Sequence, residues 1–170
     1  DVWHPDEVVR RGLGPLAPRF SFDLVVDARD ILTEEMLGDY DVVMNCKSNQ
    51  ISPANKEAWF EEGVSEVGPA PLRRYIENGG GFLALHAGLA FHNTDTSGYR
   101  ELVGATFIKH PPRCPVEVEV TVQHPVTAGV ASFNINDEHY ELDLAVADAE
   151  VLMYSSSEKG GRQPAAYVHE

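Results

Sequence analysis

Cysteine, basic residues and long apolar runs are all scarce in this chain of 170 residues. The two cysteines, Cys46 and Cys114, exclude a disulfide framework, and neither lies in a CxxC motif of the kind that binds zinc or carries out redox chemistry. No apolar stretch approaches the roughly 18 residues that a membrane-spanning helix needs. Because 13 Lys and Arg residues stand against 27 Asp and Glu, the net charge is −14, which disfavours binding to nucleic acid or to an anionic membrane.

Strand-like and helix-like segments alternate in the first half of the chain. The strand-like segments are nearly continuous apolar runs, which are typical of strands covered on both faces. This alternation predicts an α/β fold with a doubly wound, mostly parallel sheet. The expected strands are residues 22–27, 40–46 and 81–86, and the expected helices are residues 5–16, 33–37, 53–67 and, after a break at 68–71, residues 72–77.

The pattern changes after residue 104. Valines at every second position of 116–122 alternate with polar residues, which predicts a half-exposed antiparallel strand. Two further strands are expected at 151–154 and 165–168, on either side of a polar turn. We therefore expect a single domain over residues 1–170, with an antiparallel extension on an α/β core. Both ends look cut, so one strand is expected before residue 1 and another after residue 170.

Residues 84–88 (ALHAG) are the most informative place to look for chemistry. In open parallel sheets, ligands bind outside the carboxyl ends of the strands. Here a small residue lies two positions before His86 and a glycine lies two positions after it, at the end of an expected strand. That is the spacing of a nucleophile elbow. Histidine replaces the usual Ser or Cys, and it can act as a base, an acid or a metal ligand.

Other polar side chains are expected near His86. His4 and His92 follow strand ends at the same predicted sheet edge, and Glu138 brings a carboxylate from the second half. The set His4, His86 and Glu138 would suit a catalytic divalent metal such as zinc, or a general acid–base group without metal. No HxxxH or HExxH spacing decides between the two. The expected substrate-binding residues are Asn45, His92, Asp137 and Tyr140.

Several rival interpretations are disfavoured. There is no P-loop motif, and the triple glycine at 79–81 precedes a strand, so it is no dinucleotide fingerprint. Cys46 follows a strand but lacks the small-x-Cys-x-Gly frame of a nucleophile. His110 and His124 are each followed by proline and are expected to be turn residues.

Seven motifs occur in one order along nearly the whole chain. They are WHP at 3–5, YDVV at 40–43, GGGFLALHAG at 79–88, YRELVGATF at 99–107, HP at 110–111, HPVTAG at 124–129 and DEHY at 137–140. Together they resemble the ThuA-like, or trehalose-utilisation, family, whose fold is related to the class I glutamine amidotransferases. The resemblance implies a flavodoxin-like, amidotransferase-like sheet in which His86 stands at the position of the amidotransferase cysteine. Glutaminase chemistry through a cysteine thioester is therefore not expected.

The resemblance also implies a role in bacterial use of trehalose, related disaccharides or keto-sugars. His86 would be the central acid–base group or ligand, with His4 and Glu138 as partners, and an enzyme of this kind would be a sugar hydrolase or isomerase. A binding module without chemistry, a metal-dependent hydrolase and a cysteine-dependent enzyme stay as alternatives. We expect a small-molecule carbohydrate as partner, no nucleic acid and no membrane, with a homo-oligomer left open. A cytoplasmic location is expected, and export is left open.

Overall fold

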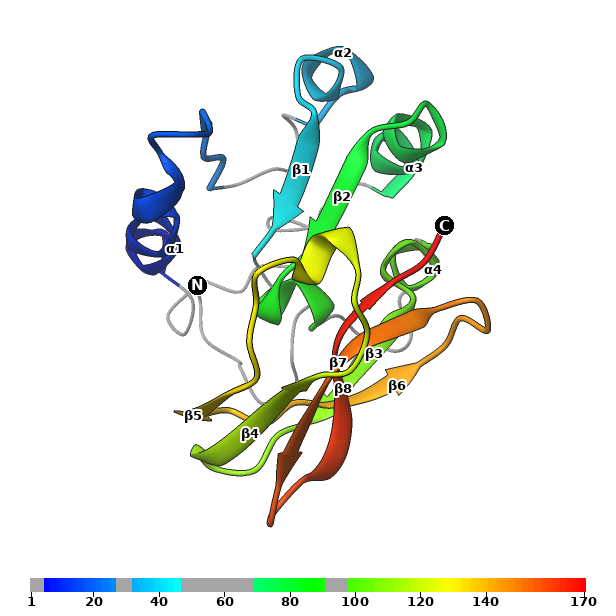
Figure 1. The fold of residues 1–170 in the computed structure, drawn as a ribbon. Helices are drawn as coiled ribbons and strands as arrows, with labels where there is room; N and C mark the ends of the chain where they lie inside the picture. The colour runs from blue at the N-terminus through cyan, green and yellow to red at the C-terminus, as the bar shows by residue number, and fades with distance from the viewer. Residues whose placement is uncertain (1–4, 27–31, 47–68, 91–97) are drawn as a thin grey trace, which may run out of the picture. The chain divides into compact units, whose positions relative to one another are not determined.

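The computed structural model describes residues 5–26, 32–46, 69–90 and 98–170 (Figure 1). They divide into two compact units, Asp1–Leu102 and Val103–Glu170. The mixed α/β composition agrees with the sequence. Among the described strands, however, parallel pairing is confined to β1 and β2, and the remaining sheets are antiparallel. The described strands therefore do not by themselves build the doubly wound sheet that the alternation predicts.

The helices of the first unit start and end where local chemistry favours it. Thr33 caps α2, because its Oγ1 accepts a hydrogen bond of 3.2 Å from the backbone N–H of Met36. In α1, acidic residues occupy the first turn and basic residues the last, and these charges interact favourably with the helix dipole. In the described part of the chain, no helix combines the length and the apolar character that crossing a bilayer requires. The helices are α1 (Asp6–Leu13), η1 (Gly14–Leu16), α2 (Glu34–Leu37), α3 (Pro69–Glu77), η2 (His86–Leu89) and α4 (Tyr99–Val103).

Two sequence predictions need correction here. The helix expected over 72–77 begins at Pro69 instead, because proline suits the first turn, where its missing N–H has no intrahelical partner. Residues 22–26 form no strand, although their apolar run predicts one. Phe22 is exposed, so the run lacks the cover on both faces that such a strand needs. Residue 27 and the helix expected over 53–67 lie outside the described residues.

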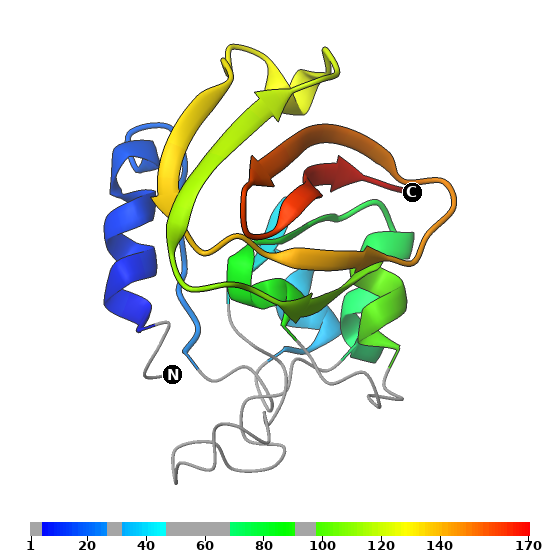
Figure 2. The same ribbon diagram turned by 90° about the horizontal axis from the view of Figure 1, so that it is seen from below.

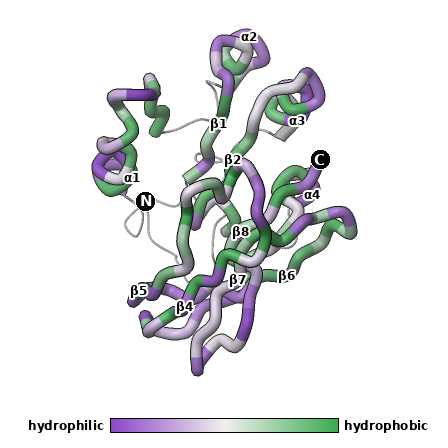
Figure 3. The backbone as a smooth tube through the Cα atoms, viewed as in Figure 1, coloured by the Kyte–Doolittle hydropathy of each residue, from purple (hydrophilic) through white to green (hydrophobic). Residues whose placement is uncertain are grey.

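The sheet of the first unit joins β1 (Val42–Asn45) to β2 (Gly81–Ala84) in parallel. Figure 3 shows the hydrophobic character of β1. The register sets Asn45 opposite Ala84, so both strands end at the same edge and their following residues emerge together. The buried apolar residues of this unit are Leu37, Leu72, Tyr75, Ala87 and Tyr99.

The second unit contains the antiparallel extension that the sequence predicts. One sheet pairs β3 with β6, and the other has the order β5-β4-β7-β8 and is strongly curved in Figure 2. The two strands expected near the C-terminus are present and longer than predicted. The elements are β3 (Ala105–Lys109), β4 (Cys114–Val120), η3 (Pro125–Thr127), β5 (Phe133–Asp137), β6 (Glu141–Leu144), β7 (Glu150–Ser157) and β8 (Gly161–Val168).

Strand β4 follows the alternation read from the sequence. Cys114, Val116 and Val118 are buried and pack with Met153, while Glu117 and Glu119 are exposed. This is the pattern of a strand with one face on the core and one in water. The strand lies between β5 and β7 and is therefore not an edge strand.

Candidate functional site

The turn after β2 holds His86 in a strained backbone conformation. Its φ is 51°, and among the described residues it is the one non-glycine with a positive φ. Leu85 before it is extended, and His86 itself begins η2. A strand-to-helix turn strained at its central residue is the geometry of a nucleophile elbow, as the spacing predicts. The His86 residue is exposed to solvent at this turn.

Gly88 makes this tight turn sterically feasible. A Cβ at this position would overlap the carbonyl oxygen of Asn45. That same carbonyl accepts a hydrogen bond of 2.9 Å from the backbone N–H of Leu85, and the N–H of Gly88 bonds to the carbonyl of Leu85 at 2.9 Å. The end of β1 and the elbow are thus held in direct backbone contact, which needs a residue without a side chain.

Beside the elbow lies a buried hydrogen-bond chain from Asn45 through Tyr99 to Gly88. The Tyr99 hydroxyl donates to the carbonyl oxygen of Gly88 at 2.8 Å and accepts from the Asn45 amide. Tyr99 is 0% exposed and Asn45 only 5% exposed. The predicted substrate residue Asn45 therefore helps to hold β1, the elbow and α4 together. Tyr99 lies in one of the family-like motifs, but its sequence position alone gave no chemical role.

In the second unit, three rings contact one another next to a carboxylate. Phe107 and Tyr140 have ring centroids 4.5 Å apart, and His110 lies on Tyr140 at 5.7 Å with only 18° between the planes. The Nδ1 of His110 lies 2.8 Å from the carbonyl oxygen of Pro111, and its Nε2 lies 3.9 Å from a Glu138 oxygen. The expectation that His110 is a turn residue is thus incomplete, because the ring also lies beside two predicted site residues.

The surroundings of Tyr140 shift the pKa of its hydroxyl. Burial, followed by the nearby carboxylates of Glu138 and Asp137, raises the pKa of Tyr140 well above its usual range. Its hydroxyl therefore stays protonated. Asp137 is held by Arg113 at 3.2 Å and accepts a 2.9 Å bond from the backbone N–H of Glu138.

Two other histidines serve the structure. His139 is 2% exposed and lies between the hydroxyls of Ser157, at 2.6 Å from Nδ1, and Ser155, at 3.0 Å from Nε2. His124 caps η3, because its Nδ1 accepts from the backbone N–H of Val126 at 3.1 Å. The structural role expected for His124 is confirmed.

Of the other predicted site residues, the structure describes some and not others. His4 and His92 lie outside the described residues. His86 belongs to the first unit and Glu138 to the second, and each is described within its own unit. Over residues 5–26, 32–46, 69–90 and 98–170, no group of three or more His, Cys, Asp or Glu side chains is arranged to hold a metal ion. The metal site of His4, His86 and Glu138 therefore stays a prediction.

A family model and a solved structure are similar to this chain. The model of the ThuA family, described as trehalose utilisation, matches residues 7–170. The chain belongs to the ThuA family. A solved structure of a ThuA-like protein from Bacteroides uniformis ATCC 8492 is similar, with 25% identity, a TM-score of 0.69, and coverage of 95% of this chain and 69% of that one. No curated protein matches the chain.

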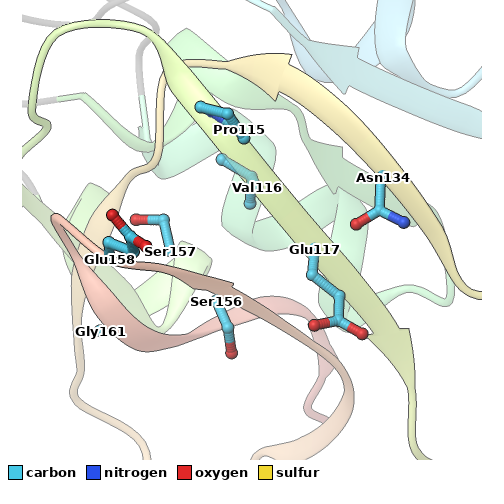
Figure 4. Close-up of a pocket in the computed structure, with 8 residues that line it drawn as sticks. All are labelled: Pro115, Val116, Glu117, Asn134, Ser156, Ser157, Glu158 and Gly161. Carbon is cyan, nitrogen blue, oxygen red and sulfur yellow. The ribbon is translucent and has the colours of Figure 1, made fainter.

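This ThuA-family chain also has a hollow lined by residues of the four-stranded sheet and of the turn between β7 and β8 (Figure 4). Carboxylates, an amide and hydroxyls contribute to its lining, all groups that can hydrogen-bond to polar ligands. None of the predicted site residues lines it, and it contains no histidine. The lining residues are Pro115, Val116, Glu117, Asn134, Ser156, Ser157, Glu158 and Gly161.

Proposed function

We propose that this ThuA-family protein acts on a carbohydrate, namely trehalose, a related disaccharide or a derived keto-sugar, and that His86 is its central acid–base group. The observation that carries the proposal is the strained, exposed His86 at the end of β2. A non-glycine residue in the left-handed region costs about 1–3 kcal/mol and persists only where the surroundings enforce it, and such residues cluster at functional sites.

The side chain suits the proposed reactions. Hydrolysis or isomerisation of a sugar requires a proton to move to or from an oxygen, or from a carbon next to a carbonyl. Imidazole titrates near neutral pH, so it can both accept and deliver that proton. A cysteine mechanism is poorly supported, because the elbow carries no thiol and burial raises the pKa of the Cys46 thiol.

The second unit offers groups that suit a sugar. A protonated Tyr140 hydroxyl is a donor, and the carboxylates of Asp137 and Glu138 are acceptors, so together they complement the hydroxyls of a carbohydrate. The predicted partnership of Glu138 with His86 joins one residue of each unit. A double-mutant cycle on turnover, with His86→Asn and Glu138→Gln, tests that partnership directly, since coupled groups give non-additive losses.

The finer fold assignment belongs to the same proposal. The parallel register of β1 and β2, and the elbow directly after β2, are both features of an amidotransferase-like doubly wound sheet. We infer that these two strands are part of such a sheet, with His86 at the position of the amidotransferase cysteine.

The decisive experiment measures turnover of a panel of trehalose, related disaccharides and their keto derivatives. Asparagine tolerates the left-handed region, so His86→Asn keeps the backbone and removes the titrating ring. We expect turnover to be lost while the melting temperature stays close to that of the wild type. His124→Asn is the matched control, because His124 is the N-cap of η3 and asparagine also caps helices well.

The outcomes separate the alternatives. Full turnover in His86→Asn overturns the proposal. Saturable sugar binding that survives this substitution, without turnover by the wild type, indicates a binding module. Loss of turnover on treatment with a chelator, restored by zinc, indicates the metal-dependent alternative and calls for the same assay in a His4→Ala variant.

A further inference from the structure

A long uncharged stretch forms an exposed apolar surface in the second unit. Residues 120–136 contain no Asp, Glu, Lys or Arg, in a chain with 13 basic and 27 acidic residues. We call this stretch the neutral segment. It spans η3 and most of β5. Its exposed apolar residues are Val126 at 64%, Val130 at 44%, Phe133 at 43% and Ile135 at 45% exposure.

The neutral segment includes an unprotected sheet edge. β5 ends the order β5-β4-β7-β8, and in the described parts of the chain no strand pairs with its outer side. Edge strands are usually protected from intermolecular pairing by Lys, Pro or bulges. β5 has the sequence FNIND and pairs with β4 in an unbroken register. The opposite edge, β8, carries Arg162 and Pro164 and pairs irregularly with β7.

We propose that β5 pairs antiparallel with β5 of a second copy of this chain, forming a homodimer about a twofold axis. A twofold contact brings identical patches together, so any net charge in the patch repels itself. With a net charge of −14, most surfaces of this chain are poor candidates for self-association. Residues 120–136 avoid this repulsion because they carry no charge, and Asp137 at the end of β5 is paired with Arg113 at 3.2 Å.

The sequence of β5 fits one register of such a pairing. If Asn134 lies opposite Asn134 of the partner subunit, Phe133 lies opposite Ile135 of the partner subunit, and the same pair recurs by symmetry. Aromatic and β-branched residues directly opposite each other are favourable cross-strand pairs. Within the sheet, Phe133 and Ile135 oppose Val118 and Val116, so both lie on the core-facing side and would extend the apolar layer across the axis.

The first test is the molar mass of the intact chain, by light scattering during gel filtration. We expect twice the chain mass of 18.7 kDa for the wild type and the monomer mass for Ile135→Lys. Val130→Glu is a second disrupting variant outside any strand, so a folding defect of Ile135→Lys does not decide the outcome. Ala165→Lys, at an exposed position of β8, is the matched control and should stay dimeric.

The second test fixes the register. Directly opposite residues of an antiparallel pair have Cα atoms roughly 4.5–5.5 Å apart, within the range that a disulfide spans. Asn134→Cys should therefore form a covalent dimer on mild oxidation, whereas the wild type with its own two cysteines and Ala165→Cys should not. A monomeric wild type at all concentrations, or a dimer unaffected by both Ile135→Lys and Val130→Glu, overturns the proposal. Since activity is not measured, the result is independent of the proposed function.

Discussion

The carbonyl oxygen of Asn45 occupies the space that a side chain on Gly88 would need. This contact joins the last residue of β1 to the turn that presents His86. The same carbonyl accepts the backbone bond from Leu85, and the carbonyl of Gly88 accepts the bond from the Tyr99 hydroxyl.

Gly88→Ala should therefore be strongly destabilising. The added methyl group meets backbone, which cannot rotate away, so we expect a loss of about 1–3 kcal/mol in the free energy of unfolding. Urea denaturation measures it. Gly12→Ala is the control, because Gly12 lies in α1 with open space around it and should gain up to about 1 kcal/mol. Equal effects at the two glycines would contradict the steric account.

Tyr99→Phe should lower stability through the lost hydroxyl alone. The ring keeps its packing against Phe82, while the bonds to Gly88 and Asn45 disappear in a buried setting, so we expect a cost of about 1–3 kcal/mol. Tyr40→Phe removes a hydroxyl bonded to Asp23 at 2.8 Å in an exposed position, and its cost should be clearly smaller. Denaturation curves of the two variants, measured side by side, make the comparison.

The strain at His86 should be visible in stability as well as in activity. A β-branched residue is a poor fit to a positive φ, so His86→Val should be less stable than the wild type by about 1–2 kcal/mol. His86→Gly relieves the strain and should not be destabilised. If valine and glycine at this position gave the same melting temperature, the backbone would not be strained there.

Tyr167 should make stability depend on pH in the alkaline range. Burial raises the pKa of Tyr167 from 10.0 to about 12, and its hydroxyl donates to the carbonyl of Val103. A pKa raised in the folded state means that this contribution is complete below the unfolded pKa and is lost as the pH rises through the folded one. Between pH 10 and 12 we therefore expect a loss of at most about 2 kcal/mol. Tyr167→Phe should lack this loss, as urea denaturation across that window would show.

Cys46 should be dispensable for activity. Because burial raises the pKa of its thiol, little thiolate is present at neutral pH and alkylation by iodoacetamide should be slow. Cys46→Ser should retain the turnover of the wild type on any sugar that the wild type converts. Loss of turnover in Cys46→Ser, with an unchanged melting temperature, would revive the cysteine mechanism.

Local signals predicted the elements whose cause is local. The short helix expected over 33–37 is present as α2, the valine alternation predicted β4, and the small residues around His86 predicted the elbow. The strand predicted at residues 22–26 is absent from the structure, because an apolar run does not specify which strand will pair with it. The start of α3 was predicted three residues too late. Proline breaks the interior of a helix, but it is well suited to the first turn, where Pro69 lies.

The predicted site was harder to read from sequence because its contacts are long-range. His110 meets Glu138 and Tyr140 only because β3 pairs with β6, which brings residues near 107 beside residues near 142. The proline after His110 gave a local explanation that is correct but partial. The role of Tyr99 was equally hard to predict, since its partner Asn45 is at the end of a strand far earlier in the chain.

The tight connection between β7 and β8 has a consequence for how the second unit assembles. Only residues 158–160 separate these strands, so closing their loop costs little chain entropy, whereas β3 and β6 must close a much longer one. The quickest pairing of the unit therefore involves its last two strands. During synthesis, β4 emerges from the ribosome long before β7. β4 pairs with β5 and β7, so it gains its second strand neighbour only after β7 has emerged. Until then β4 has at most one strand neighbour. We therefore expect the second unit to be most prone to misfolding during that interval.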